Sequence, residues 1–123
     1  MTSLTQAIGS QAEQKAESFL RKQNLKFITR NYRCKYGEID LIMQDQASLV
    51  FVEVRYRDQA SHGSGLETIT RSKKSKLIKT ATCYLIEKNL WEKVPCRFDV
   101  ISLDAAENAE MIWIQDAFGV RYY

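Results

Sequence analysis

The sequence predicts a single α/β domain (residues 1–123) whose elements follow the order αβββαββ. Two segments with helical hydrophobic periodicity and five with strand character give this order. A chain of 123 residues is long enough for one modest core and too short for two independently folded halves. With 45% hydrophobic and 27% charged residues, 5 Gly and 1 Pro, the composition is typical of a packed globular domain and excludes global disorder.

The first predicted element is a helix over residues 5–23. Its apolar residues fall on one arc, which comprises Ile8, Ala12, Ala16, Phe19 and Leu20. At about 100° per residue, Glu13 lies only about 20° beyond Leu20, at the margin of this arc. We therefore expect Glu13 to reach an interior cleft.

Three strands are predicted next. Residues 25–34 are rich in β-branched and aromatic side chains and end at a turn around residues 35–37. Residues 38–44 alternate polar and apolar side chains, and residues 49–57 form a strand rich in Val and Phe. The short polar turn at residues 45–48 joins the last two strands into an antiparallel hairpin.

The remaining segments predict a loop, a helix and two strands. Residues 58–66, which include His62 and two glycines, form a polar surface loop. A helix follows over residues 70–89, with Thr70 as its N-cap and a strongly basic first half. After Pro95, residues 96–103 and 111–118 are predicted strands joined by a polar turn.

The hairpin register predicts where chemistry can occur. A symmetric turn centred between residues 46 and 47 places Asp40 opposite Glu53 and Glu38 opposite Arg55, all on one face. Opposed carboxylates about 4.5–5.5 Å apart at Cβ destabilise a hairpin unless a cation lies between them. The alternative is that Asp40 and Glu53 are solvated and each pairs with a Lys or Arg. Phe51, on the face of Glu53, favours a covered site, where a carboxylate needs a partner or a metal.

The net charge of +3 is unevenly distributed. Two basic stretches contain no acidic residue, and either could be an ordinary solvated face. Together they flank the acidic segment, so their positive charges would attract a polyanion to a metal site between them. They are Arg21, Lys22, Lys26, Arg30, Arg33 and Lys35, and then Arg71, Lys73, Lys74, Lys76 and Lys79.

The cysteines and the hydropathy indicate a compartment. Cys34, Cys83 and Cys96 are odd in number, widely spaced and form no CxxC pair, which is typical of buried thiols in a reducing compartment. With His62 as the only histidine, they argue against a structural zinc site. No membrane span or signal peptide is evident, so we expect a cytoplasmic protein without membrane contact.

Two strings in the hairpin resemble a known family. G-E-I-D-L-I at residues 37–42 and F-V-E-V-R-Y-R at residues 51–57 resemble the YraN-like family of bacterial proteins, within the PD-(D/E)XK superfamily of restriction-endonuclease-like nucleases. Further matches cover nearly the whole chain in order: G-x-x-x-E-x-x-A at 9–16, K-x-x-K-L at 73–77, R-F-D-V at 97–100 and D-A-F at 116–118. The resemblance implies a restriction-endonuclease-like mixed β-sheet flanked by helices.

The resemblance also implies roles for individual residues. Asp40 and Glu53 match the metal ligands of the motif, and Glu13 matches the helix glutamate that some members, notably archaeal Holliday-junction resolvases, bring to the metal. The implied ion is Mg²⁺ or Mn²⁺. Arg55 stands where the motif usually has Lys, a residue thought to position or activate the attacking water. Because Arg is effectively never deprotonated, it can stabilise charge as a catalytic residue but cannot act as a general base.

These residues leave alternatives open for the function. One is a Mg²⁺-dependent endonuclease that acts on DNA, including branched or damaged DNA, with a homodimer as in resolvase-like relatives. Another is a nucleic-acid-binding module whose degenerate site no longer cleaves efficiently. A scaffold whose acidic face binds a basic partner is a third, and the two basic stretches weigh against it. We expect nucleic-acid contacts from Lys73, Lys76, Arg57, Arg33 and Lys35.

Overall fold

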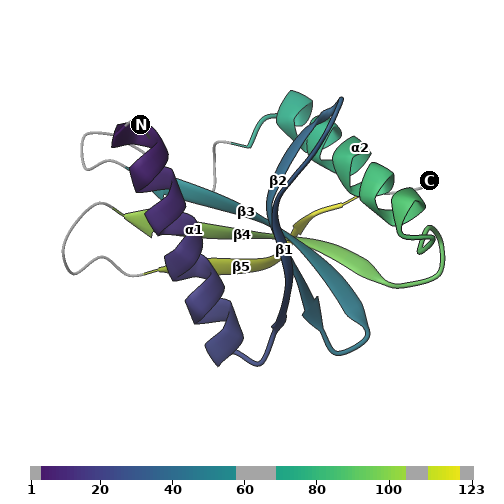
Figure 1. Cartoon of the computed structure of the whole chain (residues 1–123), viewed down its shortest axis with the longest axis horizontal. Coiled ribbons are helices and arrows are strands. Elements are labelled where there is room, and N and C mark those ends of the chain that lie inside the picture. The colour runs from purple at the N-terminus through teal and green to yellow at the C-terminus, as the bar shows by residue number, and fades with distance from the viewer. Residues whose placement is uncertain (1–3, 58–68, 105–110, 120–123) are drawn as a thin grey trace.

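A computed structural model, which describes residues 4–57, 69–104 and 111–119, shows a five-stranded sheet with one helix on each face (Figure 1). The predicted loop at 58–66, with His62, lies outside the described residues. The element order αβββαββ matches the prediction. The elements are α1 (Leu4–Lys22), β1 (Lys26–Cys34), β2 (Gly37–Asp45), β3 (Ser48–Arg57), α2 (Arg71–Glu87), β4 (Cys96–Asp104) and β5 (Ile112–Phe118).

The sheet is mixed and mostly antiparallel, in the order β1-β2-β3-β4-β5. β3 and β4 are its parallel pair, and the chain between them contains α2, as a parallel connection requires. The other three neighbouring pairs are antiparallel. β3 therefore lies at the centre of the sheet, where both of its faces are covered. None of the helices in the described ranges is long and apolar enough to cross a membrane.

Each helix covers its own hydrophobic core. Ala12, Ala16 and Leu20 of α1 pack on one face of the sheet, against buried residues that include Leu41, Met43, Val50, Val52 and Ile101. Leu77, Ala81, Tyr84 and Leu85 of α2 pack on the other face, against Ile39, Ile42, Leu49, Phe51 and Phe98. The predicted N-cap of α2 is confirmed, because the hydroxyl oxygen of Thr70 accepts a hydrogen bond from the backbone N–H of Lys73 at 3.1 Å.

The β1–β2 hairpin changes faces in its middle. Ile39 and Leu41 are two residues apart in β2 and would share a face in a regular strand, yet they lie in opposite cores. Between the β1 partners of these two residues stands Asn31, whose φ of 53° is left-handed, a conformation that Asn tolerates. The hairpin is thus twisted at Asn31 and Asp40, so one end packs on α1 and the other on α2.

The predicted register of the second hairpin is confirmed from Leu41–Val52 to Asp45–Ser48. Beyond Leu41 a side-chain hydrogen bond replaces the backbone pairing. Oδ2 of Asp40 accepts a hydrogen bond from the backbone N–H of Val54 at 2.8 Å. The ladder of backbone pairs ends at Leu41, so the predicted pairs Asp40–Glu53 and Glu38–Arg55 are not part of it, and the twist at Asp40 explains this difference.

A buried carboxylate joins β4 to β5. Asp99, with 0% exposure, accepts hydrogen bonds from Arg97 Nε at 3.0 Å, Trp113 Nε1 at 2.9 Å and the backbone N–H of Asp116 at 2.9 Å. Arg97 also donates through Nη1 to Asp45 at 2.9 Å. The strings R-F-D-V and D-A-F therefore have a structural role in this chain, since their charged residues meet at one buried carboxylate.

Candidate active site

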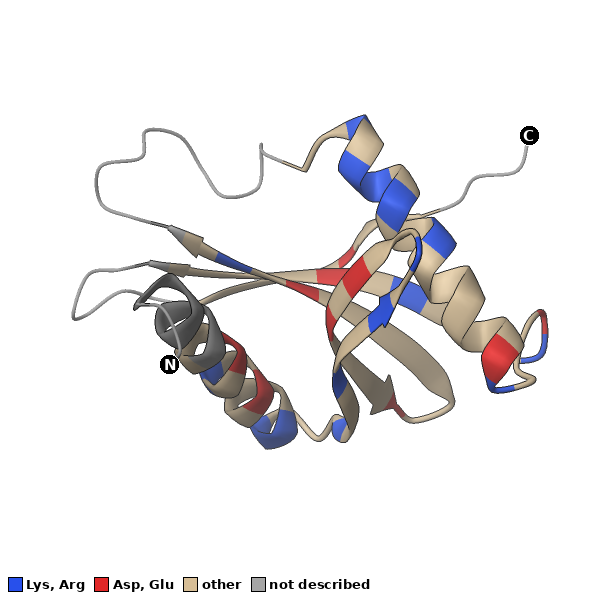
Figure 2. Cartoon of the chain, turned by 45° about the horizontal axis from the view of Figure 1, so that its top comes forward, with Lys and Arg blue, Asp and Glu red and all other residues tan. Residues whose placement is uncertain are grey.

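Four carboxylates from three elements approach one another where the hairpin twists. Glu13 comes from α1, Glu38 and Asp40 from β2, and Glu53 from β3. Their charges are close enough that Glu53, Glu13 and Glu38 all raise the pKa of Asp40. Figure 2 shows acidic residues on the central strands and on α1. The structure thus places the three predicted metal ligands, Asp40, Glu53 and Glu13, in one region.

An asparagine connects two of these acids. With its side-chain amide oriented so that the nitrogen faces the carboxylates, Asn31 donates to both oxygens of Glu13 at 3.2 Å and to Oε1 of Glu38 at 2.9 Å. Burial raises the pKa of Glu13, and the hydrogen bond from Asn31 partly opposes this rise. Sequence reasoning missed Asn31. The available signal was an Asn inside a strand, a position where this residue is rare.

Asp40 is half-buried and carries negative charge that its surroundings do not balance. Burial first, and then the charge of Glu53, raise its pKa to about 7, although the hydrogen bond from the backbone N–H of Val54 lowers it. At neutral pH the Asp40 carboxyl group is therefore partly protonated. A cation bound at this point would favour the ionised form.

This pKa predicts a pH-dependent gain in stability for Asp40→Asn. The folded chain holds the Asp40 proton more tightly than the unfolded chain, so wild-type stability falls as pH rises from about 4 through about 7. We expect the substitution to change unfolding free energy little at pH 4 and to stabilise the protein by on the order of 2 kcal/mol at pH 8. Urea unfolding at both pH values measures this difference.

The exposed acid Glu92 provides the control for this measurement, because Glu92→Gln should not reproduce the pH dependence. An equal gain from Asp40→Asn at pH 4 and pH 8 would contradict the assigned environment of Asp40.

Lys73 contacts the cluster of four carboxylates through Glu53. Its Nζ lies 2.7 Å from Oε1 of Glu53, whose side chain is only 9% exposed. Lys73 is in the first turn of α2, where the Thr70 cap fixes the backbone. The ion pair therefore connects the central strand to the start of the basic helix, and the lysine that we expected to contact nucleic acid faces the acidic site.

Arg55 follows Glu53 by two residues in β3 and so points from the same face of the strand. Its Nη1 atom is buried, and within the described part of the chain no acceptor reaches it. A buried N–H donor without an acceptor costs free energy, more so on a charged group. A bound anion would satisfy this donor. Glu38, which the symmetric register placed opposite Arg55, lies 3.3 Å from Arg33 Nε instead.

Three of the other predicted nucleic-acid contacts lie on α2 or at the β1–β2 turn. Arg33 has a side chain that is 76% exposed, and Lys76 is exposed on α2. Lys35 Nζ lies 5.1 Å from the centre of the Tyr36 ring, beside α2. Arg57 is in β3, but its side chain is outside the described residues. Figure 2 shows basic residues along α2, most densely in its first half.

The donor set suits a hard divalent cation, since Asp40 and Glu53 offer carboxylate oxygens. The unbalanced charge at Asp40 also favours a cation. Within the described ranges, however, no three His, Cys, Asp or Glu side chains are already arranged to hold a metal ion. In the structure, Lys73 pairs with Glu53, and Asn31 donates to both Glu13 and Glu38. A metal ion at Asp40 and Glu53 would therefore compete with the Lys73 ammonium for the charge of Glu53.

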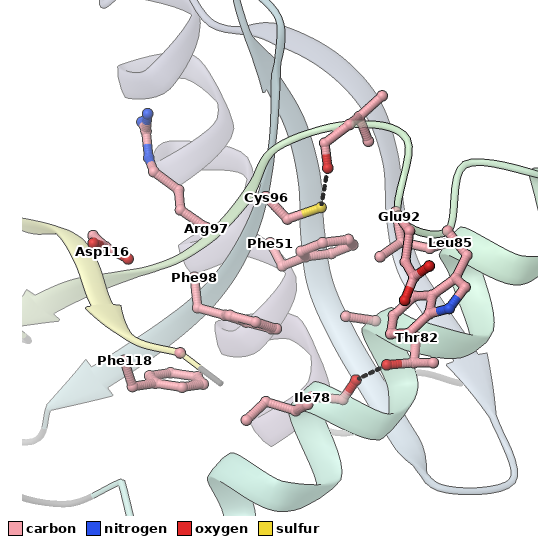
Figure 3. A pocket seen from close by; sticks show the side chains of 14 residues that line it. Phe51, Ile78, Thr82, Leu85, Glu92, Cys96, Arg97, Phe98, Asp116 and Phe118 are labelled. Carbon is pink, nitrogen blue, oxygen red and sulfur yellow. Dashed lines mark hydrogen bonds between the residues drawn. The ribbon is translucent and has the colours of Figure 1, made fainter. Parts of the chain in front are cut away.

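A cavity of about 340 Å³ lies between α2 and the β4–β5 side of the sheet, away from the carboxylates (Figure 3). Its wall contains Phe51, Phe98 and Phe118, whose rings stack with centroid distances of 5.4 and 4.8 Å. The charged groups at its edge include Arg97, already paired with Asp45 and Asp99. This apolar cavity lacks the paired carboxylates and free donor that mark the acidic site.

The chain is thus an α/β protein whose mixed sheet contains a cluster of carboxylates, with Lys73 paired to Glu53 at its edge. More particularly, the chain belongs to the family described as Uncharacterised protein family UPF0102, whose family model matches residues 12–103. This agrees with the resemblance to YraN-like proteins.

Bacterial relatives match over nearly their whole length. A UPF0102 protein of Coxiella burnetii (strain RSA 331 / Henzerling II) is 48% identical over 122 residues, which cover 99% of this chain and 100% of the relative. One from Legionella pneumophila (strain Philadelphia 1) is 45% identical over 115 residues, 94% of this chain and 97% of the relative. One from Saccharophagus degradans is 47% identical over 110 residues, with coverages of 89% and 91%.

Proposed function

We propose that the protein is a divalent-metal-dependent endonuclease that acts on DNA phosphodiesters, including those of branched or damaged DNA. The observation that carries the proposal is that one site contains both an unbalanced negative charge and an unpaired positive donor. Among the described residues, no cation balances the charge of Asp40, and Arg55 Nη1 on the same face as Glu53 lacks an anionic acceptor. A metal-bound phosphodiester supplies both. The mixed sheet between two helices is compatible with a restriction-endonuclease-like fold.

In this proposal the acidic residues would bind the metal ion and the basic residues would contact the phosphate. Asp40 and Glu53, assisted by Glu13, would hold Mg²⁺ or Mn²⁺, which when bound lowers the pKa of a water and neutralises phosphate charge. Arg55 would donate hydrogen bonds to the phosphate oxygens and stabilise the charge that develops on them. Lys73, once released from Glu53, would be a second cation beside the phosphate.

The basic surface predicts how DNA binding responds to charge reversal. Lys76→Glu should lower the affinity for DNA by on the order of tenfold at low salt, about equally for all sequences, because phosphate contacts carry no sequence information. It should also reduce the slope of log affinity against log salt concentration by more than the loss of one phosphate contact would, since it removes a cation and adds an anion. Fluorescence anisotropy over a series of salt concentrations measures both effects.

Lys88→Glu, which makes the same charge change at the exposed C-cap of α2, is the matched control and should have a smaller effect. Equal effects of the two variants, or an affinity that does not depend on salt, would remove the assignment of DNA binding to the first half of α2.

A second function is favoured by a specific observation. The Lys73–Glu53 ion pair and the Arg at position 55 are also what a nucleic-acid-binding module with a degenerate nuclease site would contain. The cleavage assay that separates the two functions uses linear, single-stranded and four-way-junction DNA with Mg²⁺ or Mn²⁺.

Arg55 variants sharpen this assay. If Arg55 acts only by electrostatics, Arg55→Lys should retain or raise cleavage, and Arg55→Ala should lower it by on the order of 10²-fold. Both variants should retain most of their DNA affinity, because the outer basic residues remain. If the wild type cleaves no DNA or RNA and Arg55→Lys confers no cleavage, the enzyme is excluded and the binding module stands.

A further inference from the structure

Two of the three cysteines, distant in sequence, meet where the β1–β2 turn packs on α2. Cys34 is the last residue of β1 and Cys83 lies in the second half of α2. The contacts of Tyr32 with Tyr84 and of Gly37 with Thr80 place the two cysteines close together, and each thiol shifts the pKa of the other. Both thiols are half-buried and free. The spacing of the cysteines gave no sign of this contact, because it depends on how α2 lies across the hairpin.

Close contacts on either side of the two thiols hold their elements together. The rings of Tyr32 and Tyr84 meet edge to face with centroids 5.2 Å apart. Gly37 lies so near α2 that a Cβ atom there would be 3.4 Å from Oγ1 of Thr80. Packing on both sides therefore keeps the segments that contain Cys34 and Cys83 together without a covalent bond.

The two thiols have different chemistry. Burial opposes ionisation of Cys34, but hydrogen bonds, including one from the backbone N–H of Tyr36 at 3.4 Å, outweigh it and lower its pKa. The neighbouring Cys34 raises the pKa of Cys83, and burial raises that of Cys96. Since the thiolate is the nucleophile, Cys34 is the reactive thiol of the three and Cys83 is placed to respond to it.

We propose that Cys34 and Cys83 form a reversible disulfide when a hydroperoxide oxidises the protein. The Cys34 thiolate attacks one peroxide oxygen, the O–O bond breaks, and the departing oxygen takes up a proton, which leaves a sulfenic acid on Cys34. The Cys83 sulfur then attacks the Cys34 sulfur and the S–O bond breaks. The hydroxide that leaves combines with the Cys83 proton as water. The two thiols lose two electrons to the peroxide, and a small thiol such as glutathione reverses the reaction.

This disulfide would tether the β1–β2 turn to α2 within the basic surface. Lys35 of the turn and Lys79 of α2 already share the Tyr36 ring, at 5.1 and 5.7 Å from its centre. In a reducing compartment such a bond forms only transiently, which is typical of a redox-sensing pair. The inference does not depend on the proposed nuclease function, because it involves neither Asp40 nor Glu53.

The experiment treats the reduced full-length protein with hydrogen peroxide, blocks free thiols with N-ethylmaleimide and maps the products by mass spectrometry. The expected product has lost two hydrogen atoms, contains a chymotryptic peptide pair linked through Cys34 and Cys83, and carries the blocking group on Cys96. Dithiothreitol should restore the original mass. Cys96→Ser should oxidise at the wild-type rate, whereas Cys83→Ser should stop at a sulfenic acid that dimedone traps.

Three results would overturn the proposal: a disulfide that involves Cys96, sulfinic acid on Cys34 with Cys83 still free, or no oxidation. The map of the wild type alone distinguishes these results, so the conclusion does not depend on whether the serine variants fold.

Discussion

Glu53→Gln is expected to abolish divalent-dependent DNA cleavage, with a loss on the order of 10³-fold in rate. The substitution keeps the size of the side chain but removes the charge that a hard cation needs. It also removes the partner of Lys73, now 2.7 Å away, so this ammonium group becomes free to contact phosphate. DNA affinity should therefore be unchanged or higher. A cleavage time course and a binding titration on the same four-way-junction DNA measure the two effects.

Glu17→Gln is the matched control for Glu53→Gln. Glu17 is one helical turn from Glu13 on α1, but it pairs with Arg21 and Arg30 outside the carboxylate group, so its substitution should leave cleavage unchanged. If Glu53→Gln cleaves as fast as Glu17→Gln, then Glu53 is not a metal ligand in the reaction. If Glu53→Gln loses binding together with cleavage, its role is structural.

Asp99→Ala should have the largest effect on stability, a loss of about 3–5 kcal/mol of unfolding free energy. Asp99 is completely buried, and its removal leaves the guanidinium of Arg97, the indole N–H of Trp113 and the backbone N–H of Asp116 without their acceptor. Each unsatisfied donor costs about 1–3 kcal/mol when water cannot replace the lost partner. Urea unfolding followed by circular dichroism measures the loss.

Asp45→Ala tests the same arginine from its more exposed side. The Asp45 side chain is 31% exposed and holds only Nη1 of Arg97, so its loss should cost about 1 kcal/mol or less. Similar losses for the two variants would mean that burial of Asp99 does not determine its contribution.

The sequence was sufficient to predict the element order, the register of the β2–β3 hairpin and the cap of α2. Each of these depends on local chemistry: periodicity, a short polar turn, and the hydroxyl of Thr70. The register also brought Asp40 and Glu53 to one region, because a hairpin with a symmetric turn leaves few ways to pair its strands.

The twist at Asn31 and Asp40 could not be predicted in the same way. A regular alternation would keep Ile39 and Leu41 on one face. In the folded chain, Leu41 packs in the core under α1 and Ile39 packs in the core under α2. The same twist turns Asn31 toward Glu13 and Glu38, and lets the Asp40 carboxylate replace a backbone partner for Val54.

Contacts between distant segments could not be predicted from the sequence either. Lys73 was expected on a solvated helix face or on DNA, but the position of α2 over β3 places its ammonium on Glu53. Cys34 and Cys83 meet for the same reason, since α2 packs on the end of the β1–β2 hairpin. Pair contacts of this kind depend on the angle of a helix across a sheet, which hydrophobic periodicity does not specify.

We propose that Asp40 and Glu53 form a divalent-metal site and that the Lys73 ammonium occupies it in the absence of metal. A crystal structure of the protein soaked in Mn²⁺, with anomalous diffraction data, tests this proposal. The expected result is an anomalous peak bound by carboxylate oxygens of Asp40 and Glu53, with the ammonium of Lys73 displaced from Glu53. A saturating soak that leaves the 2.7 Å Lys73–Glu53 pair intact, with no peak beside Asp40, would contradict the claim.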